Sequence, residues 1–189
     1  THFSELGARK MAQLVLAGLK EQNIELAERI VKHVVKKQEP MTSGLTGIQD
    51  TSFSVYSDYL KSKKNYPFIT PVMMTKTKGV KEQMNLVYCE KGDRKLLLDA
   101  FVPAGRSAKK RPAVLIVHGG GWRSGDRTHH YLLAQRLAAL GYACFTPEYR
   151  LSTEALYPAG IHDLKAAVRW VHANAKTYQV DTAKIAVLS

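Results

Sequence analysis

In the run VLIVHGGGWRSGD, residues 114–126, an apolar stretch is followed directly by a histidine, three glycines and a tryptophan. Glycine lets the backbone adopt positive φ and approach a ligand closely. Successive N–H groups in such a turn can point at one spot and stabilise a developing negative charge, as in an oxyanion hole. Two alternatives are a flexible turn without chemistry and a dinucleotide-binding fingerprint, which fits poorly because position 124 is serine.

The elements around this turn predict an α/β fold in which helices cover a mostly parallel sheet. Residues 113–118 form a continuous apolar run, typical of a strand buried on both faces. In α/β sheets, ligands bind beyond the carboxyl ends of the strands, where the glycines lie. The other expected strands cover residues 84–90, 95–103, 142–150 and 184–189, and the expected helices cover 129–141 and 159–175, the latter with Ile161, Leu164, Val168 and Val171 on one face.

Residues 84–189 resemble the α/β-hydrolase carboxylesterases of the hormone-sensitive-lipase-like and feruloyl or acetyl esterase type. The resemblance rests on HGGGW (118–122), RSGD (123–126), GYACFTPEYRLS (141–152) and YPAGIHDLKAAVRWVHANA (157–175). It implies the N-terminal half of an α/β-hydrolase sheet.

The resemblance also implies a role for each matching residue. The backbone N–H groups of Gly120 and Gly121 would form the oxyanion hole. His118, together with Gly119, would shape the turn without acting as the catalytic base, and Trp122 would form the floor of the pocket. Tyr149 and Arg150 would brace the active-site face, and Asp163 would cap or anchor its helix.

The nucleophile of that family lies on a G-x-S-x-G turn between a strand and a helix, and the catalytic acid and histidine follow it. The strand that would precede this turn is KIAVLS, residues 184–189. Ser189 is a poor candidate because the pattern requires glycine at position 187, which is valine. We therefore expect the whole catalytic triad to lie downstream of Ser189, and the chain alone to be inactive.

The N-terminal part has a different pattern. Two amphipathic helices are predicted at residues 4–20 and 24–37, and residues 38–81 read as a linker in which FSVYSDYL could form local structure. Residues 1–35 resemble the C-terminal end of SGNH/GDSL hydrolases of the rhamnogalacturonan acetylesterase type. That resemblance implies that His2 is a catalytic base; the alternative is an exposed histidine beside an ordinary helix. The predicted domains are thus 1–37, 38–81 and 82–189.

We expect a piece of a bifunctional serine esterase that removes acetyl or feruloyl groups from plant cell-wall polysaccharide, without cofactor or metal. The alternatives are a general small-ester carboxylesterase or lipase, and a non-catalytic carbohydrate-binding module. The net charge of +12 is spread along the chain without interleaved aromatic residues, so we expect a solvated basic surface and neither a nucleic-acid nor a membrane partner. Cys89 and Cys144 lie in apolar runs and are expected to be buried free thiols. A secreted or periplasmic location follows only from the resemblance.

Overall fold

The computed structural model describes residues 44–73, 76–105 and 107–189. The chain divides into two compact units, Thr1–Leu45 and Thr46–Ser189, and the fold described here is that of the second. The helices predicted at 4–20 and 24–37, and His2 with them, lie outside the described residues.

Five strands form one sheet in the order β1-β2-β4-β3-β5. The strands are β1 (Val80–Lys91), β2 (Arg94–Pro103), β3 (Arg111–Ile116), β4 (Ala143–Pro147) and β5 (Val180–Leu188). The central strand β4 is buried along its whole length. Its apolar run fits the centre of a sheet that is covered on both faces.

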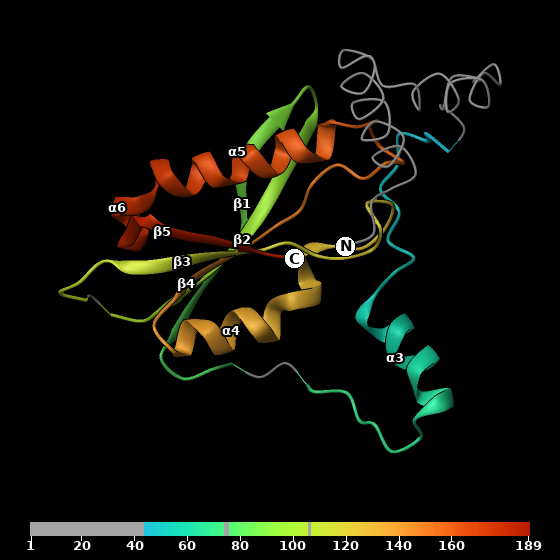
Figure 1. Cartoon of the computed structure of the whole chain (residues 1–189), viewed down its shortest axis with the longest axis horizontal. Coiled ribbons are helices and arrows are strands. Elements are labelled where there is room, and N and C mark those ends of the chain that lie inside the picture. Colours follow the sequence, from blue (N-terminus) through green and yellow to red (C-terminus); the bar gives the residue numbers. More distant parts are fainter. Residues whose placement is uncertain (1–43, 74–75, 106) are drawn as a thin grey trace, which may run out of the picture. The chain divides into compact units, whose positions relative to one another are not determined.

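Helices cover both faces of this sheet (Figure 1). On one face, α5 (Ala159–Ala173) and α6 (Ala175–Tyr178) join a core cluster with β2 and β4. On the other face, the turn η1 (Arg127–His130) leads into α4 (Tyr131–Ala139), which packs on Phe101, Ile116 and Cys144. The helices predicted at 129–141 and 159–175 are therefore confirmed, with ends shifted by a few residues.

The sheet is mixed, which corrects the expectation of a mostly parallel one. β3 pairs in parallel with β4 and β5, whereas β2 pairs antiparallel with both β1 and β4. The β1–β2 hairpin closes over the predicted turn, where Gly92 has φ 59°. A tight hairpin turn makes β1 and β2 antiparallel to each other; the antiparallel pairing of β2 with β4 is a second departure from a parallel sheet.

The buried face of α5 agrees with the prediction in part. Its buried residues are Asp163, Ala167 and Val171, a regular i, i+4, i+8 row. Val171 of the predicted stripe belongs to this row, and Leu164 and Val168 are half-buried and pack against core clusters. The hydrophobic pattern missed Asp163, because a carboxylate is not apolar and is buried only where it has a partner.

Residues 38–81 were predicted to be a linker, and the structure shows local order within them. Ser54 caps α3 (Val55–Asn65) in a capping box with Ser57, in the stretch where local structure was considered possible. Residues Thr46, Gly47, Asp50 and Phe53 contact loops of the sheet unit. The domain boundaries themselves stay predictions.

Both cysteines are free, but only Cys144 is buried and Cys89 is half-buried. The expectation for Cys89 is thus wrong, because β1 is an edge strand with one face partly open to solvent. Burial raises the pKa of the Cys144 thiol to about 12, so it is unreactive. No helix in the described ranges is both long and apolar enough to cross a bilayer.

Candidate functional site

The glycine turn follows β3 and has a backbone that only glycine can adopt at its centre. Gly120 has φ 119° and Gly121 has φ 64°. A Cβ atom built on Gly120 would lie 1.9 Å from the carbonyl oxygen of Ser124. The turn is tight because the carbonyl oxygen of Gly120 accepts hydrogen bonds from the N–H groups of Arg123 and Ser124, both at 3.1 Å. We call residues 117–126 the glycine loop.

The N–H groups of Gly120 and Gly121 are not used by the loop itself. Neither group donates to an acceptor anywhere in the part of the chain that the structure describes. Gly120 is half-buried and Gly121 is exposed, so both residues are open to a ligand. The loop therefore offers two adjacent backbone donors at the carboxyl end of β3, as an oxyanion-binding site requires.

His118 lies at the start of the glycine loop and is almost fully buried. Its ring stacks on Tyr149 with 4.5 Å between centroids, and its Nδ1 lies 2.8 Å from the carbonyl oxygen of Gly119. Because a carbonyl only accepts, Nδ1 carries the proton. Burial lowers the pKa of His118. A neutral ring that is bonded to its own loop is compatible with the predicted role of His118 in shaping the turn, which stays a prediction.

Tyr149 and Trp122 connect the glycine loop to the segment after β4. The Tyr149 hydroxyl donates to the carbonyl oxygen of His118 at 3.0 Å, and the two rings of Trp122 and Tyr149 lie 5.2 Å apart. The carbonyl oxygen of Trp122 accepts a bond from the N–H of Ser152 at 2.8 Å. These contacts agree with a bracing role for Tyr149, whereas the pocket floor predicted at Trp122 stays a prediction.

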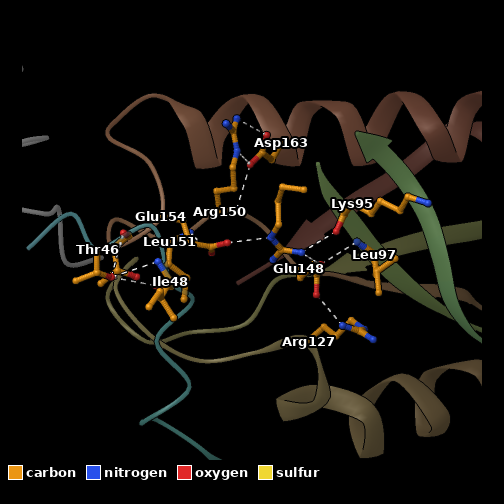
Figure 2. Close-up of polar contacts among 12 residues, drawn as sticks. Thr46, Ile48, Lys95, Leu97, Arg127, Glu148, Arg150, Leu151, Glu154 and Asp163 are labelled. Carbon is orange, nitrogen blue, oxygen red and sulfur yellow. Dashed lines mark hydrogen bonds and ion pairs between the residues drawn. The ribbon is translucent and has the colours of Figure 1, made fainter. Parts of the chain in front are cut away.

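Arg150 and Asp163 form a bidentate ion pair between the segment after β4 and helix α5 (Figure 2). The two contacts measure 2.8 and 2.9 Å, and Asp163 is fully buried. The Asp163 carboxylate also accepts a bond from the backbone N–H of Arg150. Its hydrogen bond to the guanidinium raises the pKa of Arg150. The ion pair joins α5 to the segment after β4, and the anchoring role of Asp163 stays a prediction.

A second group of buried charges was missed by the sequence analysis. Arg127, in the turn after the glycine loop, contacts Asp99 at 2.6 Å and Glu148 at 2.7 Å. Burial opposes the charge of Arg127, but the two carboxylates outweigh it and raise its pKa. The hydroxyl of Tyr131 also donates to Asp99. This network fixes η1, and with it the end of the glycine loop, to the centre of the sheet.

Glu148 extends this network to Arg94 at the start of β2. Figure 2 shows its carboxylate between Arg127 and the N–H of Leu97, and it also contacts Arg94 at 2.7 Å. Arg94 reaches Glu154 at 2.9 Å. The sequence held two signals for the carboxylates that pair with these arginines. One is the aspartate inside the apolar strand KLLLDAFVP, and the other is the glutamate directly after β4.

The C-terminal end of β5 lies beside the start of the glycine loop. The N–H of Val117 donates to the carbonyl oxygen of Leu188 at 2.8 Å. Ser189 follows directly and is exposed. Within the described ranges, no group of three or more histidine, cysteine, aspartate or glutamate side chains is placed to hold a metal ion.

Fold and site together resemble part of an α/β-hydrolase of the esterase kind. Residues 98–189 match the family model described as BD-FAE. Two relatives from Mycobacterium tuberculosis are the esterase LipC, 35% identical over 92 residues, and the carboxylesterase NlhH, 43% identical over 77 residues. These alignments cover 48% and 40% of this chain, but only 23% and 24% of the relatives.

Solved esterase structures share the fold. The Est2 esterase of Thermogutta terrifontis aligns with a TM-score of 0.51 and 27% identity, over 58% of this chain and 39% of its own. Esterase B from Lactobacillus rhamnosis aligns with a TM-score of 0.55 and 25% identity, over 70% of this chain and 41% of its own. The chain thus spans about a quarter of the length of the curated relatives that it matches.

Proposed function

We propose that this chain supplies the oxyanion-binding loop of a serine carboxylesterase. The observation that carries the proposal is the pair of Gly120 and Gly121 N–H groups, which are adjacent, free of acceptors in the described part of the chain, and held by positive φ. Two backbone donors in this arrangement fit a tetrahedral oxyanion. The esterase relatives and structural neighbours support the same reaction class.

In the proposed reaction, a serine hydroxyl attacks the carbonyl carbon of an ester while a histidine takes its proton. The resulting oxyanion accepts hydrogen bonds from the N–H groups of Gly120 and Gly121. The alcohol leaves with the proton from the histidine, and water then hydrolyses the acyl-enzyme to release the acid. His118 takes no part in these proton transfers, because its Nδ1 is bonded to Gly119 and its ring is buried.

The nucleophile is proposed to follow Ser189. The contact between Val117 and Leu188 directs the continuation of β5 to the edge of the sheet where the glycine loop begins. Strand ends of parallel neighbours meet at that edge. A serine a few residues beyond β5 would therefore lie next to the two donors.

A fluorophosphonate probe tests this placement, because it labels activated serines covalently. We expect labelling of one serine in a version of the protein extended beyond Ser189, at a position after residue 189, and no labelling of the 189-residue chain. Peptide mapping identifies the modified residue. Labelling of Ser189, or of any serine within the chain, would contradict the proposal.

For the substrate, we propose acetyl or feruloyl esters of plant cell-wall polysaccharide, a choice that rests on the sequence resemblance alone. The names of the curated relatives fit a general carboxylesterase equally well. Assays of the extended protein on acetylated xylan, feruloylated arabinoxylan and short nitrophenyl esters separate the two. Turnover of nitrophenyl esters without release of acid from either polysaccharide would favour the general enzyme. The SGNH-type domain with His2, and the secreted or periplasmic location, stay predictions.

A further inference from the structure

A short segment upstream of the sheet lies against the glycine loop. Residues 46–53 precede α3 and were predicted to belong to a linker, yet they form hydrogen bonds to both loops that carry the candidate site. We call residues 46–53 the strap. The family match begins only at residue 98, so the strap lies outside the part of the chain that carries the resemblance.

The first contact of the strap is with the end of the glycine loop. The N–H of Gly125 donates to the carbonyl oxygen of Asp50 at 3.1 Å. Asp50 is itself held in a local turn, because its Oδ1 accepts a bond from the N–H of Ser52 at 2.9 Å. Its carboxylate also lies 4.0 Å from Arg123, a partly exposed pair that adds little.

The second contact is a buried histidine. The Nε2 of His129 lies 3.0 Å from the carbonyl oxygen of Phe53, so Nε2 carries the proton. The ring of Phe53 meets the ring of His129 edge to face, with 5.0 Å between centroids. The side chain of His129 is only 6% exposed. The strap thus contacts η1 through a buried side chain.

The third contact fixes the other end of the strap. The N–H groups of Thr46 and Gly47 both donate to the carbonyl oxygen of Thr153, at 2.9 and 2.8 Å. Thr153 follows Ser152, whose N–H donates to Trp122 in the glycine loop. The strap is thus connected to both sides of the candidate site, at Gly125 and through Thr153.

Gly125 transmits the position of the strap to the oxyanion donors. A Cβ atom at Gly125 would lie 2.6 Å from the carbonyl oxygen of Gly119, 2.9 Å from Nδ1 of His118 and 3.0 Å from Cε1 of His129. These distances show how closely Gly125 fits between the strap-bound histidine and the peptide that precedes Gly120. A shift of Gly125 toward or away from the strap would therefore move that peptide.

From these contacts we infer that the strap is a positioning element of the active site: it holds the glycine loop in the shape that presents the Gly120 and Gly121 N–H groups. The inference rests on the proposed function for its catalytic meaning, but its structural part can be tested without activity. Phe53 and His129 are positioning residues, because they touch neither the substrate nor the reacting atoms.

Amide hydrogen exchange of the 189-residue chain tests the structural part. In Phe53→Ala, loss of the aromatic contact should make the amides of residues 119–125 exchange about threefold to tenfold faster, while the amides of β2 and β4 keep their rates. His129→Phe keeps a ring at that position but removes the Nε2 donor, and should have the same local effect. Phe68→Ala is the matched control, because Phe68 is 80% exposed and contacts Tyr66 instead.

Unchanged exchange in residues 119–125 in both variants would overturn the inference. So would uniformly faster exchange across the sheet, since that would make the strap a general stabiliser. If Phe53→Ala does not fold, Phe53→Leu provides the same comparison with most of the apolar volume kept.

Kinetics of the extended protein test the catalytic part. Phe53→Ala should lower kcat by about threefold to tenfold with KM unchanged, and Phe53→Tyr should restore it. An unchanged kcat beside faster exchange in the loop would overturn the catalytic role of the strap. If the wild-type extended protein hydrolyses no ester, the proposed function fails, and the exchange measurement still decides whether the strap holds the loop.

Discussion

Gly120 is the residue at which a side chain conflicts most directly with the site. Alanine there would combine φ of 119° with a Cβ atom 1.9 Å from a backbone oxygen, so the loop must open to accommodate it. We expect Gly120→Ala to destabilise the protein by roughly 2–4 kcal/mol. In the extended protein we expect kcat to fall about 100- to 1,000-fold, as when an oxyanion donor is lost. Chemical denaturation and steady-state kinetics measure the two effects.

Gly119→Ala is the matched control, because Gly119 lacks positive φ and a Cβ atom there would meet nothing within 4 Å. We expect it to fold with nearly unchanged stability. Equal losses in both variants would show that the loop tolerates neither substitution for a reason other than the shape of Gly120.

His118 makes the stability of the protein depend on pH. Its pKa is lowered in the folded state by burial, so the unfolded chain binds its proton more readily. The stabilisation is therefore complete above the ordinary histidine pKa of about 6.5 and is lost as the pH falls toward the folded value. One such proton contributes a slope of at most about 1.4 kcal/mol per pH unit.

His118→Asn should remove that part of the slope, and denaturation curves between pH 5 and 8 would show it. Some slope will remain in the variant, because burial also lowers the pKa of His130. Identical slopes in the two proteins would mean that His118 is protonated equally in the folded and unfolded states.

Among single residues, the sequence pointed to those whose proposed roles depend only on their immediate neighbours in the chain. The glycines and His118 form a continuous motif, and their backbone requirements follow from residue type alone. The pairing of Arg127 could not be predicted, because Asp99 lies on β2 and Glu148 directly after β4, and only the sheet order brings the two together. Phe53 opens the stretch FSVYSDYL, where local structure was considered possible, but nothing in the sequence indicated its contact with His129, 76 positions later.

Among the elements, the segment after β4 and helix α5 are joined by one buried ion pair. Removing a single partner leaves a charge in the interior without compensation. We expect Asp163→Asn to cost about 3–5 kcal/mol of stability, although the substitution changes only one atom. Thermal denaturation measures the loss.

The exposed pair of Asp181 and Lys184 offers a matched comparison, with Lys184 69% exposed and 3.6 Å from its partner. Asp181→Asn should change stability by less than about 1 kcal/mol, as for surface pairs in general. A similar loss in the two variants would show that the Arg150–Asp163 pair does not hold α5.

The elements themselves were largely predictable from periodicity and turn residues, and their arrangement was not. Apolar runs identified β2, β3 and β4, because strands in the middle of a covered sheet have little polar surface. β5 begins at Val180, four residues before the predicted strand. The sequence pattern missed this first half because it is polar, mostly exposed and only partly paired with β3. The patterns of the individual strands do not reveal in which direction each strand runs, so the antiparallel pairings of β2 could not be predicted from them.

For the molecule as a whole, we expect the 189-residue chain to lack esterase activity. It contains the two proposed oxyanion donors, and hydrolysis also needs a nucleophile and a base in the same site. The test compares the purified chain with the extended protein on nitrophenyl acetate and on acetylated xylan. Turnover by the short chain that is abolished in Ser189→Ala would show that the nucleophile is Ser189.

The strap has a further consequence, which concerns the order of folding. Its contacts close loops of 76 residues at Phe53 and 107 residues at Thr46, and loop closure costs entropy before the contact stabilises anything. Contacts of such long range tend to form late. We therefore expect Phe53→Ala to speed unfolding while leaving the folding rate nearly unchanged in stopped-flow experiments. The glycine loop would then acquire its working shape at the end of folding, as the last part of the sheet unit to become native.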